Sequence, residues 1–309
     1  MTDFWKNKNV FITGHEGFLG SNLTKQMLAY QANIVGLDIK INRKNTIFTK
    51  NEYKKINVIK GNVVNYKLLK NIITKFKIDV VFHLAAEAIV GKAAKNPLGT
   101  FSTNIRGTWN LLEACRYSEK VKAIIIASSD KAYGRQQKLP YIECAPLQGD
   151  HPYDVSKSCA DLVANAYFHT YDLPVAITRC GNIFGAGDFN FSRIVPDAIR
   201  CALRNKILLI RSNGKFVRDY VYIDDIINGY VFLAEKLQKL KLSGEAFNFS
   251  NEEPISVIEL VKKIYRLVRK NPNYAILNQA KYEIRYQYLS SKKARRILGW
   301  KPKFDLEEG

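Results

Sequence analysis

The sequence contains few cysteines and no paired cysteine spacing. Its five cysteines are Cys115, Cys144, Cys159, Cys180 and Cys201, and no two of them form a Cys-x-x-Cys motif. We therefore expect neither a disulfide framework nor a zinc or other metal site. The cysteines are interpreted as reduced thiols of a cytoplasmic protein.

Long apolar runs are absent as well. No stretch of about 18 consecutive apolar residues occurs, so no transmembrane helix and no membrane partner are expected. The first nine residues are polar and lead directly into a strand-like run, which does not match a signal peptide. With 47% hydrophobic and 25% charged residues, the composition is typical of a soluble globular protein.

Negative charge is scarce. The chain has 48 Lys and Arg against 28 Asp and Glu, a formal net charge of +20 that would suit a nucleic-acid binder. However, no block of five like charges and no zinc-finger, RRM or KH signature is present. We favour a basic field that attracts a small anionic ligand, with no nucleic-acid partner. A catalytically silent nucleotide- or RNA-binding protein is the distant alternative.

Short apolar runs alternate with segments of helical spacing through residue 179. This alternation predicts an α/β protein with a parallel sheet that is covered on both faces. The predicted strands are 10–13, 34–37, 57–60, 79–84, 122–127 and 174–179, and the predicted helices are 22–30, 67–75, 104–118 and 153–171.

The rhythm loosens after residue 179. A loop with glycines at 181, 185 and 187 is followed by predicted helices at 193–205, 223–237 and 256–268. We expect a first domain over 1–179 and a smaller lobe over 180–309. Part of 221–248 is expected to return to the sheet.

Three glycines lie between the first predicted strand and helix. Gly14, Gly17 and Gly20 follow a Gly-x-x-Gly-x-x-Gly spacing. Glycine lets the backbone turn tightly and approach a pyrophosphate, which the free N–H groups of the helix N-terminus can then bind. An ordinary strand-to-helix turn is the alternative, but the placement within a strand–turn–helix–strand unit favours a dinucleotide site.

Asp38 ends the second predicted strand. A carboxylate at this position can bind both adenosine ribose hydroxyls and would repel a 2′-phosphate, which favours NAD over NADP. Lys40, Arg43 and Lys44 follow closely, so NADP stays open, and a solvated Asp in a turn is the alternative.

Tyr153 and Lys157 are four residues apart and therefore share one helix face. A tyrosine hydroxyl titrates near about 10 and is a poor base at neutral pH. The lysine ammonium, helped by a positive nicotinamide, would favour the phenolate. Ser129 lies 24 residues before Tyr153, at the end of a predicted strand.

Together these motifs resemble the extended short-chain dehydrogenase family. The resemblance rests on the glycine triplet, on Ser129, Tyr153 and Lys157, and on His-Leu-Ala-Ala at 83–86, Arg-Cys-Gly-Asn at 179–182 and Arg-Asp-Tyr-Val-Tyr-Ile-Asp-Asp at 218–225. It covers nearly the whole chain. The family implies a Rossmann-type doubly wound sheet for NAD(P) and a C-terminal lobe for a nucleoside-diphosphate sugar. It also implies homodimers built from the helices near 104–118 and 153–171.

Within the family, Ser129-Asp130-Lys131 resembles the CDP-glucose 4,6-dehydratases. Epimerases usually carry small or neutral residues after the catalytic hydroxyl, and in the dTDP-glucose dehydratases an Asp is followed by Glu. The sequences at 4–8 and 182–188 are similar to the CDP-glucose branch too. A surface ion pair is the alternative for Asp130 and Lys131.

The resemblance assigns a role to each matching position. Tyr153 would take the C4 hydroxyl proton, Ser129 would hydrogen-bond the C4 oxygen, and Lys157 would tune Tyr153 and bind the nicotinamide ribose. Asp130 would be the acid for the C6 hydroxyl, with Lys131 assisting at C5. Asn182, Arg193 and Arg218 would bind the nucleotide and its diphosphate. The remaining NAD contacts would be Gly14, Gly17, Phe18, Leu19, Gly20, Asp38, Asn62, Val63, Leu84, Ala85 and Ala86, with Asn62 facing the adenine.

The predicted function is thus an NAD-dependent nucleotide-sugar 4,6-dehydratase, formally a lyase. A nucleotide-sugar epimerase or dehydrogenase on the same scaffold is the alternative.

Overall fold

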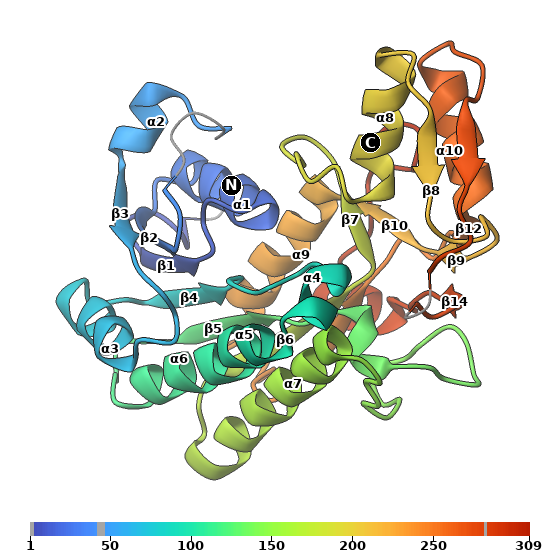
Figure 1. Cartoon of the computed structure of the whole chain (residues 1–309). Coiled ribbons are helices and arrows are strands. Elements are labelled where there is room, and N and C mark those ends of the chain that lie inside the picture. The colour runs from blue at the N-terminus through green and yellow to red at the C-terminus, as the bar shows by residue number, and fades with distance from the viewer. Residues whose placement is uncertain (1–2, 42–46, 281–282) are drawn as a thin grey trace.

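The computed structural model describes residues 3–41, 47–280 and 283–309. Arg43 and Lys44, named above as possible partners of a 2′-phosphate, lie outside the described residues. The alternation of strand and helix predicted from the sequence is present, and it forms a large sheet with helices on both faces (Figure 1).

Seven parallel strands make up the main sheet. Their spatial order is β11-β6-β5-β4-β1-β2-β3. The chain starts at β1, builds outward through β2 and β3, and then crosses to β4, β5 and β6 on the other side. This reversal between β1 and β4 opens a crevice at the carboxyl ends of the strands, where doubly wound sheets bind ligands. The strands are β1 (Asn9–Thr13), β2 (Asn33–Asp38), β3 (Ile56–Lys60), β4 (Val80–His83), β5 (Ala123–Ala127), β6 (Val175–Cys180) and β11 (Ala246–Phe249).

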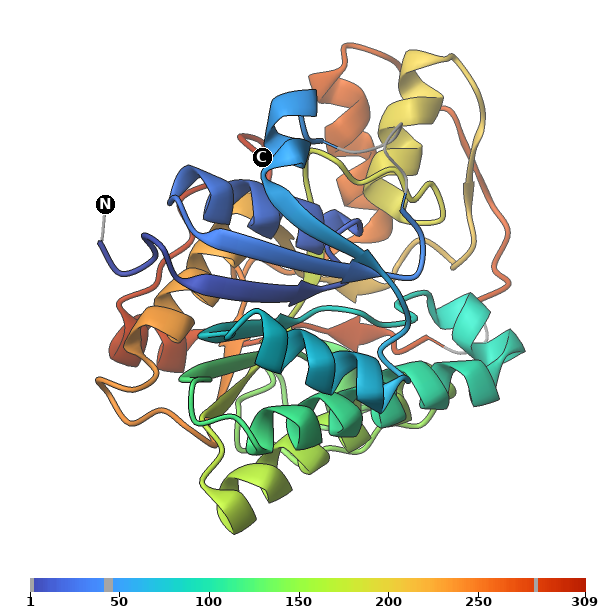
Figure 2. The same ribbon diagram turned by 90° about the vertical axis from the view of Figure 1, so that its left-hand side faces the viewer.

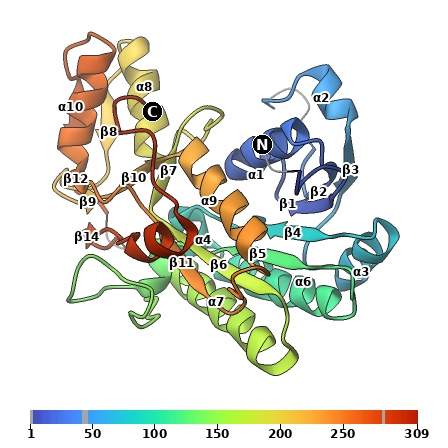
Figure 3. The same cartoon turned by 180° about the vertical axis from the view of Figure 1, so that it is seen from behind.

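Helices bury both faces of this sheet, which explains why its strands are nearly all apolar. On one face, α1 (Phe18–Ala29) and α9 (Ile223–Lys236) pack side by side (Figure 3). The opposite face is covered by α3 (Tyr66–Lys75), α6 (Gly107–Arg116) and α7 (Pro152–Tyr171). The fold class predicted from the sequence is confirmed.

Some helix boundaries differ from the prediction. α1 starts at Phe18 rather than at residue 22, because the glycine turn ends at Gly17. The helix expected over 104–118 is the end of a longer helical stretch, which begins with α5 (Pro97–Phe101) and passes through a π-helical turn at Ser102–Arg106. The short helices α2 (Lys50–Lys54) and α4 (Val90–Lys95) were not predicted.

A smaller lobe lies above the carboxyl ends of the sheet, where α8 (Ile194–Leu203) packs on α10 (Val257–Leu267) (Figure 2). Its own apolar core includes Ala198 and Val261, both fully buried. Among the described residues, its short strands are β7 (Asn182–Phe184), β8 (Leu208–Ile210), β9 (Val217–Arg218), β10 (Tyr220–Tyr222), β12 (Ile255–Ser256), β13 (Tyr274–Ile276) and β14 (Tyr286–Gln287).

The chain returns from the smaller lobe to the main sheet. β11 pairs in parallel with β6, in the register Ala246↔Ile177, and becomes the edge strand of the sheet. Phe249 at its end packs edge-on against Trp300, at 5.0 Å between ring centroids. None of the helices in the described ranges is long and apolar enough to cross a membrane.

Candidate active site

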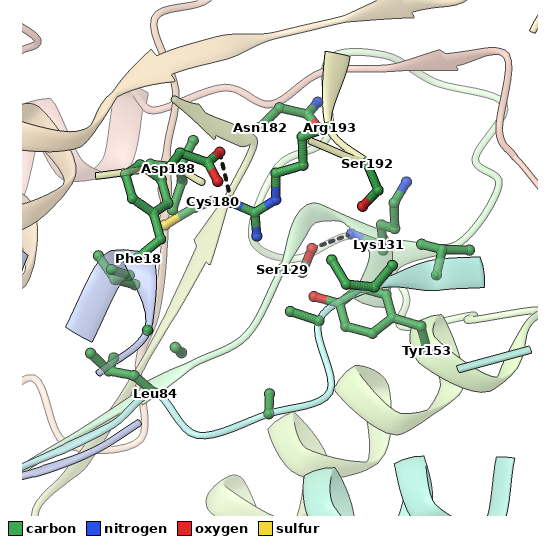
Figure 4. A pocket seen from close by; sticks show the side chains of 18 of the residues that line it. Phe18, Leu84, Ser129, Lys131, Tyr153, Cys180, Asn182, Asp188, Ser192 and Arg193 are labelled. Carbon is green, nitrogen blue, oxygen red and sulfur yellow. Dashed lines mark hydrogen bonds and ion pairs between the residues drawn. The ribbon is translucent and has the colours of Figure 1, made fainter. Parts of the chain in front are cut away.

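A cleft of about 870 Å³ lies between the carboxyl ends of the sheet and the smaller lobe. This volume is in the range that small-molecule sites occupy. The structure brings together in its lining all of the predicted site residues, some of which Figure 4 shows: Gly14, Gly17, Phe18, Leu19, Gly20, Asp38, Asn62, Val63, Leu84, Ala85, Ala86, Ser129, Asp130, Lys131, Tyr153, Lys157, Asn182, Arg193 and Arg218.

The glycine turn is packed too tightly against its own backbone to carry side chains. A Cβ atom on Gly20 would overlap the Gly14 carbonyl oxygen, and one on Gly14 would lie 2.9 Å from the Ala85 Cα. Gly14 also has a φ of +74°, a conformation that favours glycine. No side chain caps α1. Its first N–H groups thus face the cleft, and this geometry fits a dinucleotide pyrophosphate.

Both carboxylate oxygens of Asp38 accept hydrogen bonds from backbone N–H groups. Its Oδ2 accepts a hydrogen bond from the Glu16 N–H and its Oδ1 accepts one from the Lys40 N–H, each at 3.2 Å. This carboxylate stands at the end of β2, beside the glycine turn. The position suits recognition of an adenosine ribose.

A buried Thr–His pair shapes the turn after β4. Thr13 Oγ1 lies 2.8 Å from His83 Nδ1 and accepts the N–H groups of Leu84 and Ala85, each at 3.2 Å. On its other side the His83 ring lies 3.2 Å from Thr108 Oγ1. Burial lowers the pKa of His83 to about 3, so the imidazole is neutral. The Thr13–His83 pair therefore fixes the loop at 84–86, which contains three of the predicted NAD contacts.

Ser129 and Asp130 begin a short 3₁₀ turn, η2 (Asp130–Tyr133), at the end of β5. Ser129 Oγ donates to Asp130 Oδ1 at 2.9 Å and accepts the Lys131 N–H. Only 5% of Asp130 is exposed. Burial raises the pKa of this carboxyl above its ordinary value, although Lys131 and Ser129 oppose the shift. At a given pH, the Asp130 carboxyl is therefore protonated to a larger extent than the carboxyl of an exposed aspartic acid.

Tyr153 and Lys157 reach the cleft from α7. The Tyr153 hydroxyl points to the same part of the cleft as Ser129 (Figure 4). Burial raises the pKa of Tyr153, and hydrogen bonding to Ser129 opposes the shift. Lys157 Nζ donates to the Ala127 carbonyl at 2.7 Å, and burial lowers its pKa to about 8. Ionisation of Tyr153 therefore needs a positive charge beside it.

Lys131 extends from the 3₁₀ turn toward the smaller lobe. Its Nζ donates to Gln287 Oε1 at 2.9 Å. Gln287 is fully buried on β14. Gln287 was not predicted, because no motif marks it and it lies 156 residues after Lys131.

An ion pair under the site anchors the 3₁₀ turn. Arg179 makes a two-pronged contact with Asp161, with Nε to Oδ2 at 2.9 Å and Nη2 to Oδ1 at 2.8 Å. Its third nitrogen donates to the Tyr133 hydroxyl and to the Glu143 carbonyl, each at 2.9 Å. The Tyr133 hydroxyl in turn donates to Asn248 Oδ1 at 2.7 Å. These contacts tie η2 to β6 and β11.

Cationic side chains line the side of the cleft that the smaller lobe forms. Arg218 is 5% exposed, and its Nη2 lies 3.3 Å from Glu283 Oε2. Arg193 Nη1 lies 3.2 Å from Asp188 Oδ2, and Figure 4 shows its guanidinium pointing into the cleft. Asn182 Nδ2 donates to the Asp219 carbonyl at 3.3 Å. This wall can take an anionic ligand.

Other residues of the lining were not predicted, among them Glu16, Asp188, Ser192 and Glu283. Glu16 stands between two of the motif glycines, and its acidic side chain was the available signal. Among the described residues, no group of three or more His, Cys, Asp or Glu side chains is arranged to hold a metal ion.

Comparison with known proteins places the chain in a family. The sequence profile of the family described as GDP-mannose 4,6 dehydratase matches residues 11–309. The chain belongs to this family. As a member of it, the chain is 32% identical over 325 residues to the CDP-glucose 4,6-dehydratase of Salmonella typhimurium, with 99% of this chain and 89% of the relative covered. The resemblance to the epimerase and dehydratase branch of the extended short-chain dehydrogenases is confirmed.

Solved structures of family relatives share the fold. A dTDP-glucose 4,6-dehydratase from Bacillus anthracis, in complex with NAD, superposes with a TM-score of 0.86 at 27% identity, covering 98% of this chain and 94% of that one. A UDP-glucose 4-epimerase from Thermotoga maritima, with UDP-glucose, gives a TM-score of 0.87 at 26% identity, covering 97% and 96%.

Proposed function

We propose that this chain is an NAD-dependent nucleotide-sugar 4,6-dehydratase, a lyase that acts on a CDP-glucose-like substrate. Membership of the dehydratase family and the likeness to the Salmonella enzyme support the reaction and the CDP-sugar respectively. The observation that carries the proposal is Asp130, a buried carboxyl beside Ser129 in the wall of the cleft.

Asp130 matters because the two candidate reactions differ in their need for an acid. An epimerase removes and returns hydride at one carbon. A dehydratase must also expel the C6 hydroxyl, which is a poor leaving group unless an acid protonates it as it departs. Burial raises the pKa of Asp130. Near neutral pH, Asp130 therefore donates a proton more readily than an exposed carboxyl does.

The other residues of this wall have roles at C4 and C5. Tyr153 takes the proton of the C4 hydroxyl, Ser129 hydrogen-bonds the C4 oxygen, and the Lys157 ammonium stabilises the phenolate and holds the nicotinamide ribose. Lys131 assists removal of the C5 proton, while the C6 hydroxyl leaves as water with the proton that Asp130 donates, so one water is lost in total. When bound, NAD supplies the redox chemistry by accepting hydride from C4 and returning it at C6.

The two sides of the cleft divide the binding. We propose that residues 1–179, with the returning segment of 221–248, hold NAD along the glycine turn, Asp38, Asn62 and the 84–86 loop. The lobe formed by the rest of 180–309 holds the nucleotide sugar. There Arg193 and Arg218 bind the diphosphate, which guanidinium groups contact well, and Asn182 contacts the nucleotide.

The test substitutes the proposed acid. Asp130→Asn keeps the size and hydrogen bonding of the side chain but removes its proton-donating group. We expect NAD binding to be unchanged and water loss to slow by roughly 10²- to 10⁴-fold, the usual range for one general acid. Asp79→Asn is the matched control, because Asp79 is about as buried as Asp130 but precedes β4, at the end of the sheet away from the cleft.

The readout is the fate of deuterium placed at C4 of a panel of nucleotide glucoses. In the wild type the label should appear at C6 of a product that has lost one water, as mass spectrometry detects. Label retained at C4 without loss of water would instead establish the epimerase, the second candidate, which the Thermotoga structure and the shared Ser129, Tyr153 and Lys157 set favour.

We also propose a cytoplasmic homodimer. All five cysteines are free thiols, as in a reducing compartment. Leu98 on α5, Trp109 on α6 and Leu162 on α7 are 81%, 42% and 57% exposed, on helices that pack against one another. Exposed apolar side chains gathered on one surface are typical of a protein interface.

A further inference from the structure

The adenosine end of the cleft contains a second carboxylate beside Asp38. Glu16 lies in the glycine turn, lines the cleft, and offers its own N–H to Asp38 Oδ2 at 3.2 Å. Its side chain is 7% exposed. A hydrogen bond from the Glu16 backbone to the Asp38 side chain therefore links the two acidic residues. Both residues line the part of the cleft that would face an adenosine ribose.

The Glu16 side chain is held from outside the glycine turn. Tyr53, on the short helix α2, donates its hydroxyl to Glu16 Oε1 at 2.6 Å. A capping box made by Thr49 and Glu52 fixes the start of that helix. The carboxylate thus has a defined position, unlike that of a solvated surface glutamate.

The charge of Glu16 is not neutralised by its buried neighbour. His15 Nε2 lies 3.5 Å from Glu16 Oε1, and His15 is fully buried. Burial lowers the pKa of His15, although Glu16 and Asp38 oppose the shift, so the imidazole is neutral at physiological pH. Within the described ranges, Lys40 is the cation nearest in sequence to Asp38, and it is exposed.

We propose that Glu16, positioned by Tyr53, is a second cofactor-selecting carboxylate, which together with Asp38 excludes dinucleotides that carry a 2′-phosphate. This inference rests on the proposed dinucleotide site. A 2′-phosphate adds a charge of about −1.5 to −2. Two fixed carboxylates in a partly desolvated cleft repel that charge more strongly than a single one does.

The experiment measures the affinities of NAD and NADP by calorimetry in the full chain. Three variants are compared with the wild type: Glu16→Gln, Tyr53→Phe and Glu119→Gln. The last removes one negative charge from an exposed position outside the cleft, and so controls for the net charge of +20. Thermal unfolding of each variant checks that it is folded.

We expect Glu16→Gln to raise NADP affinity about tenfold at low salt, and by less as salt increases, while NAD affinity changes by less than about twofold. Tyr53→Phe should raise NADP affinity by a smaller factor, and Glu119→Gln should change neither ligand. Equal NADP affinity in Glu16→Gln and Glu119→Gln would overturn the proposal for Glu16 while leaving the dinucleotide site intact. A wild type that binds neither ligand would overturn the site itself.

Discussion

Removing the Asp161 carboxylate tests whether the ion pair under the active site holds the 3₁₀ turn in place. Asp161 is 2% exposed and Arg179 is 5% exposed. After Asp161→Ala, the Arg179 guanidinium stays between Tyr133 and the Glu143 carbonyl, so it cannot turn to water. Breaking one partner of such a buried pair costs about 3–5 kcal/mol, because the remaining charge is uncompensated.

The expected change in melting temperature follows from the size of the chain. At ~2.1 cal/mol/K per residue, unfolding 309 residues has an entropy of roughly 650 cal/mol/K, so each kcal/mol lowers the midpoint by about 1.5 °C. Asp161→Ala should therefore lower it by about 5–8 °C, as differential scanning calorimetry measures. Asp161→Asn, which keeps an acceptor oxygen, should have a smaller effect.

Glu113→Ala is the control, because Glu113 pairs with Arg116 and both side chains are 28% exposed, far more than Asp161 and Arg179. Partly exposed pairs contribute about 0–1 kcal/mol, so the control should lower the midpoint by less than about 2 °C. Equal shifts in Asp161→Ala and Glu113→Ala would refute the reasoning. Turnover of Asp161→Ala should also fall at temperatures where the variant is folded, since η2 carries Asp130 and Lys131.

Three further changes test other parts of the molecule. Arg218→Ala should weaken CDP binding roughly 10- to 100-fold in calorimetry without altering NAD affinity, because a buried charged hydrogen bond is lost. Burial places the pKa of His83 at about 3, below its ordinary 6.5, so the unfolded state binds the extra proton between these values. The wild-type melting temperature should consequently decrease as the pH is lowered from 6.5 to about 3, and it should decrease less steeply in His83→Gln. Parallel plots of melting temperature against pH for the two proteins would contradict this. Leu162→Glu should yield monomers in light scattering if α7 forms the dimer interface.

The main sheet could be predicted because each strand is a short apolar run. Strands buried on both faces need no alternation of polar and apolar residues, and runs such as 122–127 therefore stand out between polar turns. The start of α1 was placed four residues late, since the glycines of its first turn look like loop. The short strands of the smaller lobe, such as β9 (Val217–Arg218), contain too few residues for any period to appear.

The lining of the cleft could be predicted where a motif marks it. Glycine turns and the Tyr153–Lys157 spacing are local patterns, and parallel strands bring their carboxyl ends to one edge of the sheet. Gln287 and Glu283 carry no such pattern. Gln287 reaches Lys131 because β14 pairs with β9, and Glu283, three residues before β14, meets Arg218 on β9. Both contacts join distant segments and depend on tertiary packing rather than on local spacing.

The edge position of β11 has a consequence for synthesis of the chain on the ribosome. The first six strands of the sheet are complete by Cys180, but the seventh comes from residues 246–249, and Trp300, which packs on Phe249, is made later still. At translation rates of about 5–20 residues per second, the interval from Cys180 to Phe249 lasts roughly 3–14 s. Throughout it, β6 lacks the partner that β11 will provide, and that edge of the sheet is open to other nascent chains. Folding of this protein in the cell thus benefits from protection of that edge until β11 emerges.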